Sequence, residues 1–278
     1  MMQDDTRQTT MIALSNKDFS RLRTFIYKEC GINIIDSKRT MLEARLQKRL
    51  RKLDLTSFSG YCDYLFSPNG IKEELTDMIN QVTTNKTDFF REPAHFDYLR
   101  RKVLPELSRS RSTIAAWSAG CSSGEEPYTL AMVLKEFGCN FTILGTDIST
   151  KVLDKAKLAV YDEERIDPIS PELKKKYLLA SKDRIKRLYR IVPELRTHVR
   201  FRRLNFMDGD FGFREPLDVI FCRNVIIYFD KPTQEKLLRK FYKCLAPDGY
   251  LFMGHSETLF GMDVPLVQAA PTIYRKAV

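Results

Sequence analysis

The sequence predicts an α/β fold, in which an all-helical N-terminal domain precedes a doubly wound sheet domain with a small inserted β-subdomain. Two observations predict it. Up to about Asn85 the apolar residues follow helical spacing, whereas from Ile114 onward short β-rich runs alternate with helical patterns. Such alternation is typical of a mostly parallel sheet covered by helices on both faces. We therefore expect a helical domain over residues 1–85 and a sheet domain over residues 86–278.

The helical domain follows from the spacing of leucine and aromatic residues. Phe19 and Leu22 begin one helical pattern, and Ser15 precedes them as a candidate N-cap. Leucines then recur every four residues from Leu42 to Leu50, which indicates one apolar stripe of a second helix. No strand alternation interrupts the pattern.

The sheet domain is predicted from short apolar runs. The expected strands are residues 114–117, 141–144, 199–204, 219–222 and 250–253, with terminal strands at 266–269 and 272–275, one of them antiparallel. The expected helices are residues 128–137, 150–158 and 233–245, the last stopped by Pro247, Asp248 and Gly249. Residues 161–196 are more than one crossover needs, and residues 187–192 alternate like a strand, so we expect an inserted subdomain there.

Composition limits the classes of protein that fit. The chain has 278 residues and is 43% hydrophobic and 29% charged, typical of a globular protein of about two domains. No apolar run approaches the ~20 residues of a membrane span, and the polar first ten residues fit neither a signal nor a transit peptide, only a loose tail. The net charge of +10 suits nucleic acid or an acidic protein partner equally well.

The cysteines and histidines do not indicate a metal site. Six cysteines are scattered without a C-x-x-C pair, which fits a reducing cytoplasmic compartment. The three histidines stand apart in the sequence, so we expect no metal and no acid–base pair of histidines.

The stretch WSAGCSSGEEP at residues 117–127 is the most informative feature. An apolar run enters a loop of small residues, a helix start follows, and the next apolar run ends in Asp147. This is the order of a nucleotide-binding βαβ unit. The loop lacks the G-x-G-x-x-G spacing, and Glu125 and Glu126 would repel a pyrophosphate. It therefore favours a cationic adenosine ligand, S-adenosylmethionine, with an ordinary α/β turn as the alternative.

Polar residues at later strand ends extend this candidate site. Asp147 can hold two ribose hydroxyls or cap the next helix. Asn205 and Phe206 can pair with adenine and cover its face, or form a polar turn. Arg223 and Asn224 follow a strand where α/β sheets bind ligands, whereas Tyr228 lies in an apolar segment and fits either a site or the core.

Two further segments have alternative interpretations. NKTDFFREP at residues 85–93 joins the two domains and can act as a lid over the cofactor or as a linker with aromatic anchors. Residues 38–52 form a basic helix in which Glu43 is the only acid. Its cations form either a solvated face or a docking surface for a negative partner.

Taken together, these motifs closely resemble the chemotaxis receptor methyltransferase (CheR) family. The matching segments are NKTDFFRE, WSAGCSSGEEPY, GTDIS, FCRNVIIYF and PDGYLFMGHSE, in family order, and the resemblance covers residues 15–277. It implies a Rossmann-like methyltransferase domain that uses S-adenosylmethionine to methylate glutamates of bacterial chemoreceptors. It also implies a cytoplasmic protein whose partner is the helical signalling region of those receptors, with no nucleic acid and no membrane insertion. Nothing demands more than a monomer.

The resemblance also implies roles for residues. The cofactor contacts would be Asn85, Thr87, Arg91, Ala119, Glu125, Asp147, Asn205, Phe206, Arg223 and Asn224. Glu125 would meet the methionyl ammonium, and Arg91 and Tyr228 would lie nearest the transferring methyl. The receptor-docking cations would be Arg45, Lys48, Arg49 and Lys52. Some members capture a receptor's C-terminal peptide through a glycine-bearing loop, but residues 180–186 here are basic and glycine-free, so we expect no tethering.

Two other functions remain open from the sequence. A nucleic-acid methyltransferase would suit the positive charge, but aromatic residues do not interleave with the basic helix and no Asn-Pro-Pro-Tyr-type motif is present. The second function is that of a receptor-binding protein that senses the cofactor but does not use it in a reaction. The presence of Asp147, Glu125 and Arg91 argues against that loss of activity.

Overall fold

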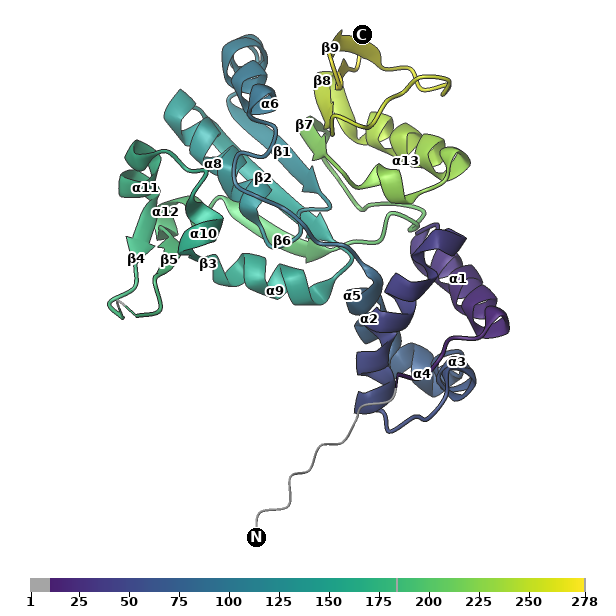
Figure 1. Ribbon diagram of the computed structural model, residues 1–278. Helices are drawn as coiled ribbons and strands as arrows, with labels where there is room; N and C mark the ends of the chain where they lie inside the picture. Colours follow the sequence, from purple (N-terminus) through teal and green to yellow (C-terminus); the bar gives the residue numbers. More distant parts are fainter. Residues whose placement is uncertain (1–10, 184, 278) are drawn as a thin grey trace. The chain divides into compact units, whose positions relative to one another are not determined.

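The computed structural model describes residues 11–183 and 185–277, so the predicted N-terminal tail lies outside the described residues. The chain divides into two compact units, one ending at Thr83 and the other beginning at Thr84 (Figure 1). Within the described ranges, no helix combines the length and apolar character that crossing a membrane requires.

The N-terminal unit is helical throughout its described part. Its elements are α1 (Asn16–Cys30), η1 (Asp36–Lys38), α2 (Arg39–Lys52), α3 (Phe58–Leu65), α4 (Pro68–Glu73) and α5 (Leu75–Val82). Ser15 caps α1 by accepting the backbone N–H of Asp18, as its position predicted. Leu22, Leu42 and Leu46 are fully buried, so the predicted apolar stripes form the core of this unit.

The second unit is built on a seven-stranded sheet with the strand order β6-β2-β1-β7-β8-β10-β9. The strands are β1 (Thr113–Ala119), β2 (Asn140–Asp147), β6 (Val199–Arg203), β7 (Leu217–Cys222), β8 (Leu245–Met253), β9 (Val267–Ala270) and β10 (Ile273–Arg275). The first five in spatial order pair in parallel, and β10 runs antiparallel to β8 and β9. This topology confirms the predicted α/β class.

Helices cover both faces of this sheet (Figure 1). They are α6 (Pro93–Tyr98), the π-helical turn η2 (Leu99–Val103), α7 (Leu104–Leu107), α8 (Glu125–Phe137), α9 (Thr150–Leu158), η3 (Ile226–Tyr228) and α13 (Lys231–Cys244). Successive strand residues point to opposite faces. The sheet therefore has a hydrophobic core on each face. Phe221 of β7 belongs to the core that contains residues of α6 to α8, and Trp117 of β1 belongs to the core that contains Phe241 of α13.

Several elements are longer than predicted, and β8 differs most from its predicted range. The sequence placed the last helix at 233–245 and the following strand at 250–253, but β8 already begins at Leu245. Leu245 pairs with Leu217 of β7, and a bulge then separates it from the pair Val219 and Tyr250. Asp248 has a φ of 63°, so the Pro-Asp-Gly segment bends the strand instead of only ending the helix.

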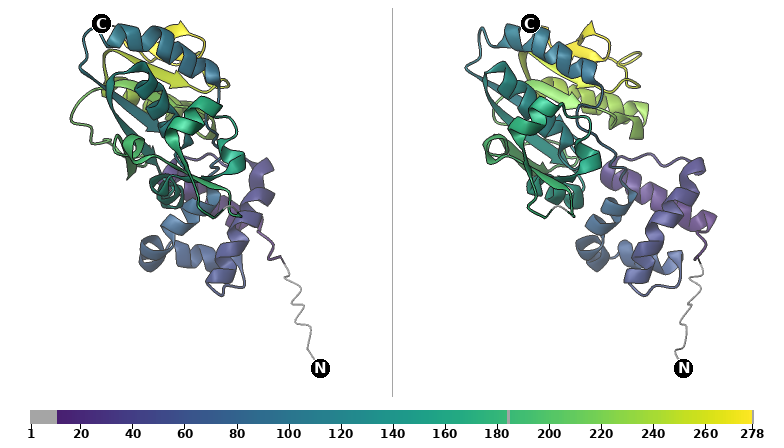
Figure 2. Two further views of the ribbon diagram at one scale, coloured as in Figure 1. Left: turned by 90° about the vertical axis from the view of Figure 1, so that its left-hand side faces the viewer. Right: turned by 60° about the vertical axis from the view of Figure 1, so that its left-hand side comes forward.

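The inserted subdomain contains a three-stranded sheet of order β3-β5-β4. Its elements are β3 (Val160–Asp162), α10 (Glu163–Ile166), α11 (Pro171–Tyr177), β4 (Leu178–Ala180), β5 (Leu188–Ile191) and α12 (Pro193–Arg196). In Figure 1 and Figure 2 it lies beside α8, against which α12 packs. It has its own antiparallel pairing and yet shares the core of the large sheet through residues such as Tyr161 and Ile191.

Candidate active site

The predicted cofactor residues gather at one edge of the large sheet. Ala119 ends β1, Asp147 ends β2, Asn205 follows β6 and Arg223 follows β7. These four strands run parallel in one sheet, so their carboxyl ends share an edge. Such an edge is where open α/β sheets bind ligands.

The turn after β1 is closed over the end of β2. The N–H groups of Gly120 and Cys121 both donate to the carbonyl oxygen of Thr146, each at 2.8 Å. Gly120 has a φ of 82°, and a Cβ there would lie 2.6 Å from Cγ2 of Val225. Only glycine permits this conformation and this approach, so the small-residue loop keeps the backbone tight against the strand ends.

Asp147 joins this turn to the start of α9. Its Oδ2 accepts the N–H of Ser122 at 2.9 Å, and its Oδ1 accepts the N–H of Ser149 at 2.9 Å. The carboxyl group is buried, which raises its pKa, while these backbone hydrogen bonds oppose the rise. Each carboxylate oxygen has a second lone pair, so the group retains the acceptor capacity that ribose hydroxyls require.

The two glutamates that begin α8 have different environments. The Glu125 carboxylate is buried, accepts the hydroxyl of Ser123 at 2.8 and 3.0 Å, and lies 3.5 Å from Nη1 of Arg165. Burial raises its pKa. Glu126 instead accepts the Ser118 hydroxyl at 2.6 Å and Nε of Arg223 at 2.7 Å. Glu126 is therefore structural, and Glu125 is the carboxylate suited to a cationic ligand.

Arg223 holds the junction segment to the end of β7. Besides its bond to Glu126, its Nη1 donates to the carbonyl oxygen of Arg91 at 2.5 Å and lies 3.5 Å from Oε2 of Glu92. The guanidinium also lies over the ring of Phe96, 5.1 Å from its centroid. These are all protein contacts, so the structure assigns Arg223 a positioning task, and its predicted contact with a cofactor stays a prediction.

Asn224 has a buried side-chain oxygen that no group in the described part of the chain hydrogen-bonds. Its backbone φ is 59°, and Nδ2 lies 3.5 Å from Oε1 of Glu92. Among the described residues nothing donates to its Oδ1, although the atom is buried. A buried, unpaired polar atom is costly unless a ligand supplies the hydrogen bond. Together with the acceptors of Asp147 and the carboxylate of Glu125, this edge fits a ligand that carries hydroxyl and ammonium donors.

The junction segment at residues 85–93 is bonded to the cofactor edge, as both interpretations of it allow. The Ser122 hydroxyl donates to the carbonyl oxygen of Asn85 at 2.9 Å, and the N–H of Phe90 donates to the Thr129 hydroxyl at 3.2 Å. Thr87 is buried. Arg91 is half-buried, and its Nη1 donates to the carbonyl oxygen of Lys86 at 3.1 Å.

The segment after β6 forms the polar turn that was one of its two interpretations. Oδ1 of Asn205 accepts the N–H of Met207 at 3.0 Å. Phe206 is half-buried and joins an aromatic group, with its ring centroid 5.7 Å from that of Phe241 and 6.4 Å from that of Trp117. A contact of this pair with adenine remains a prediction.

Comparison with known proteins identifies the family. Residues 17–83 match the model described as "CheR methyltransferase, all-alpha domain", and residues 85–273 match "CheR methyltransferase, SAM binding domain". The chain belongs to the CheR methyltransferase family. S-adenosylmethionine is accordingly its cofactor, as the loop at residues 117–127 predicted.

Curated relatives match over nearly their full length. A "Chemotaxis protein methyltransferase" of Borreliella burgdorferi is 41% identical over 276 residues, covering 95% of this chain and 96% of that protein. One of Escherichia coli is 38% identical over 273 residues, covering 96% and 93%. "Chemotaxis protein methyltransferase 2" of Pseudomonas aeruginosa is 39% identical over 267 residues, covering 95% and 94%.

Glu257 is a site residue of this CheR chain to which the sequence analysis gave no role. It is buried, and its carboxylate accepts four backbone N–H groups: those of Asn224, Val225 and Ile226 at 2.9 Å and that of Gly254 at 2.6 Å. It therefore fixes the turn that leads from β7 to Tyr228, whose side chain is half-buried. The only feature of the sequence that pointed to Glu257 was its position at the end of the PDGYLFMGHSE segment.

Two histidines of the CheR fold meet although the sequence separates them. The ring centroids of His95 and His255 are 5.2 Å apart, so their separation in the sequence does not keep this pair apart in the fold. Their ligand atoms and those of Glu92 lie within 4.8 Å of one another, a span that a metal could bridge. However, Nη1 of Arg223 lies 3.4 Å from Nδ1 of His95 and 3.5 Å from Oε2 of Glu92. The guanidinium already supplies the positive charge there.

The basic helix α2 corrects part of the docking prediction. Arg49 is only 6% exposed, and it donates from Nε and Nη2 to the buried Glu74 at 2.8 and 2.5 Å. Arg45 is half-buried and donates to the carbonyl oxygen of Val82 at 2.6 Å. Arg49 is thus wrong as a surface docking residue, because it neutralises a buried acid. Lys48 and Lys52 are exposed, as the prediction requires.

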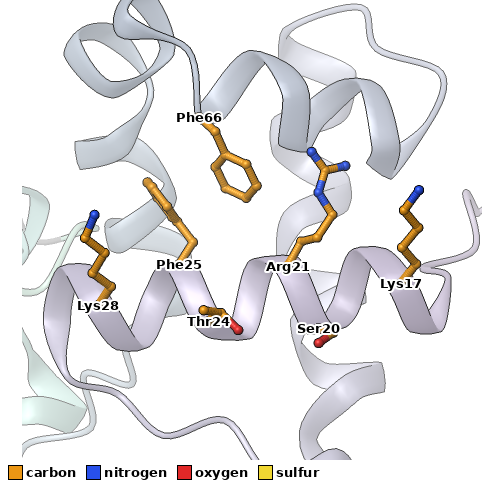
Figure 3. A pocket seen from close by; sticks show the side chains of 7 residues that line it. All are labelled: Lys17, Ser20, Arg21, Thr24, Phe25, Lys28 and Phe66. Carbon is orange, nitrogen blue, oxygen red and sulfur yellow. The ribbon is translucent and has the colours of Figure 1, made fainter.

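A second cationic surface lies on α1. A hollow of about 620 Å³ is lined by Lys17, Ser20, Arg21, Thr24, Phe25, Lys28 and Phe66 (Figure 3). The rings of Phe25 and Phe66 form its apolar wall, with centroids 4.6 Å apart. Nη2 of Arg21 is paired with Asp63 at 2.5 Å, so part of the positive charge is neutralised within the unit. None of the predicted cofactor residues lines this hollow.

Proposed function

We propose that this chain transfers a methyl group from S-adenosylmethionine to glutamate side chains of chemoreceptors. The products are glutamate 5-O-methyl esters and S-adenosylhomocysteine, and the reaction serves adaptation in chemosensory signalling. The observation that carries the proposal is membership of the CheR family, whose relatives bear the name chemotaxis protein methyltransferase. The cluster of Asp147, Glu125 and Asn224 at one sheet edge supports it.

Methylation of a glutamate carboxylate requires little acid–base catalysis by the protein. A glutamate side chain, with an unperturbed pKa of about 4.3, is already ionised at pH 7, so no general base is needed. The sulfonium centre of the cofactor supplies the activation of the methyl group. The task of the chain is to hold the carboxylate oxygen in line with the methyl and the sulfur, and good alignment can lower a barrier by ~7–11 kcal/mol.

Arg91 and Tyr228 are the residues proposed for this alignment. The Arg91 guanidinium is half-buried and is tied to the carbonyl oxygen of Lys86, which limits how closely it can pair with a substrate. Too tight a pair would reduce the nucleophilicity of the attacking oxygen. Tyr228 lies on the turn that Glu257 fixes, where a phenol can donate a hydrogen bond to the same carboxylate.

The remaining edge residues would bind the cofactor. Asp147 would hold the ribose hydroxyls, Asn205 and Phe206 would surround adenine, and Glu125 would meet the methionyl ammonium. The other contacts would come from Asn85, Thr87, Ala119, Arg223 and Asn224. For Asn224 the unpaired Oδ1 is the atom that would accept a cofactor donor.

The exposed face of α2 would dock the substrate. Chemoreceptor signalling regions are helical rods with acidic methylation sites, and Lys48, Arg51 and Lys52 are exposed along α2. Attraction between these cations and acidic side chains would steer the enzyme to the rod. Residues 180–186 are basic and free of glycine, which supports an enzyme that reaches its methylation sites without binding a receptor's C-terminal peptide. Position 184 lies outside the described residues.

The test is methyl transfer from radiolabelled S-adenosylmethionine to chemoreceptor-containing membranes, followed by mild base. Release of the label as volatile methanol is the expected result, because carboxyl esters hydrolyse in base. Label that survives base would indicate nitrogen methylation and favour a nucleic-acid substrate. Bound cofactor without any transfer would favour a sensor that binds receptors.

A further inference from the structure

The inserted subdomain extends one arginine to the cofactor edge. Arg165 lies on α10, directly after β3, and the side chain of Asp162 accepts its backbone N–H at 2.9 Å. From this short helix, Nη1 of Arg165 donates to the carbonyl oxygen of Thr87 at 2.9 Å. The same Nη1 lies 3.5 Å from Oε1 of Glu125. Arg165 therefore touches both the junction segment and the first turn of α8.

The Glu125 carboxylate that Arg165 faces also accepts hydrogen bonds from the Ser123 hydroxyl and from its own backbone N–H. Glu125 is 1% exposed, and the Ser123 hydroxyl contacts both of its oxygens. The positive charge of Arg165 lowers the Glu125 pKa that burial raises. A buried acid and a partly exposed base thus lie side by side at the end of the glycine-rich turn.

The Arg165 guanidinium has N–H groups that are available for a further ligand. Its side chain is 44% exposed, and within the described residues its Nε and Nη2 have no hydrogen-bond partner. The planar fork of an arginine suits the two oxygens of a carboxylate, which can accept two parallel N–H bonds. Arg165 can therefore keep its bond to Thr87 through Nη1 and bind a carboxylate through the other two nitrogens.

The amino-acid end of the cofactor has the complementary charges. In S-adenosylmethionine and in S-adenosylhomocysteine one carbon carries both an ammonium and a carboxylate. An acid and a base that lie close together can pair with both ligand charges, and burial of either charge without a partner would be costly. Glu125 and Arg165 provide this pair of opposite charges.

We propose that Arg165 binds the α-carboxylate of the cofactor while Glu125 binds its α-ammonium. The proposal rests on the role of Glu125 given under the proposed function. It means that the inserted subdomain completes the cofactor site, and that Arg165 selects ligands that retain the carboxylate.

The test is calorimetric binding of two ligands to the full chain. S-adenosylhomocysteine has the amino-acid end, whereas 5′-methylthioadenosine lacks it and keeps the nucleoside and the sulfur. We expect Arg165→Met to lower the affinity for S-adenosylhomocysteine by about 10- to 100-fold, which is the cost of a lost charge-assisted hydrogen bond. Its affinity for 5′-methylthioadenosine should be unchanged. Arg165→Lys, which keeps the charge without the fork, should fall between.

Matched controls separate binding from folding. Arg187 is an exposed arginine of the same subdomain, 70% exposed and paired with Glu163 at 2.8 Å on the surface, so Arg187→Met should bind both ligands like the wild type. A decarboxylated analogue of S-adenosylhomocysteine, which retains the ammonium, should lose affinity with Glu125→Gln and not with Arg165→Met.

Two outcomes would overturn the proposal. Equal losses for both ligands in Arg165→Met would mean that the residue only supports the fold of the site. Unchanged affinity for S-adenosylhomocysteine would mean that it makes no contact with the carboxylate. The binding test uses no receptor, so it can be interpreted even if the chain does not methylate glutamate. Conversely, a negative binding result would contradict the role of Arg165 and would not contradict glutamate methylation.

Discussion

Oε1 of Glu257 accepts the backbone N–H of Val225 at 2.9 Å, which ties the loop after β8 to the turn after β7. The same carboxylate also accepts the N–H groups of Asn224, Ile226 and Gly254. Backbone amides thus surround it, although burial raises its pKa. Asn224, proposed to bind the cofactor, and Tyr228, proposed to align the substrate, both lie on the segment that it holds.

Glu257→Gln tests this arrangement with little change in shape. The glutamine NH₂ group would face two backbone N–H donors, so we expect a loss of stability of about 1–3 kcal/mol in urea unfolding. Because the Tyr228 turn would move, turnover should fall more than the affinity for S-adenosylhomocysteine. Glu215→Gln, at an exposed position of the same unit, should change neither quantity. A parallel loss of affinity and turnover would show that Glu257 supports the whole edge.

Arg91 and Tyr228 should differ in their effect on methyl transfer. Arg91→Ala removes the charged group proposed to orient the substrate, so turnover should fall by about 100-fold or more. Tyr228→Phe removes one neutral hydrogen bond and should cost about 10-fold. Initial rates at saturating cofactor measure both. Wild-type rates in either variant would remove that residue from the mechanism.

Charge reversal on α2 tests receptor docking. Lys48→Glu should lower kcat/KM for receptor-containing membranes several-fold, with the loss smaller at high salt, because surface charges act mainly on association. Its affinity for S-adenosylhomocysteine should equal that of the wild type. Lys72→Glu makes the same change at an exposed position on α4 and should leave receptor methylation unaffected. If both variants lose activity equally, only net charge matters.

Arg49 should behave as a core residue. Arg49→Met would leave the carboxylate of Glu74 buried and without its guanidinium, at a cost of about 3 kcal/mol. Glu74→Leu added to that variant should restore part of the loss. Lys52→Met, on the exposed side of the same helix, should change the free energy of unfolding by less than about 0.5 kcal/mol. Similar losses for Arg49→Met and Lys52→Met would contradict the buried ion pair.

His95 should make the fold sensitive to acid. Burial and the neighbouring Arg223 lower its pKa to about 4, against an attractive contribution from Glu92. Between its ordinary value of about 6.5 and this value, the unfolded chain binds a proton that the folded chain does not. Stability is therefore lost as pH falls through that window, by ~2 kcal/mol at pH 5 relative to pH 7.5.

The comparison of wild type with His95→Gln isolates this effect. The buried carboxyls Glu125, Asp147 and Glu257 have raised pKa values and act in the opposite direction, so the difference between the two proteins is the informative quantity. Urea unfolding at both pH values should show a smaller loss in the variant. Parallel pH profiles would mean that His95 is protonated equally in both states.

Local patterns were enough to predict the sheet domain. Strand runs ending in Asp147 and before Arg223 predicted the parallel sheet and its ligand edge, because parallel strands bring their carboxyl ends together. The Ser15 cap was visible for the same local reason. These features depend on neighbouring residues along the chain.

Contacts between distant residues could not be predicted in this way. The spacing of α2 put Arg49 beside the leucine stripe, but only the position of Glu74 on a later segment makes it a buried partner. The role of Glu257 depends on amides that precede it by a strand and a helix. His95 and His255 meet for the same reason, through packing that composition does not reveal.

The most direct test of the account is mass spectrometry of a chemoreceptor signalling region after incubation with the enzyme and S-adenosylmethionine. The account predicts added methyl groups on glutamate side chains, removed by mild base and formed far more slowly when Arg91→Ala replaces the wild type. Methyl groups on lysine, on another residue type or on copurified nucleic acid, with unmodified glutamates, would contradict it.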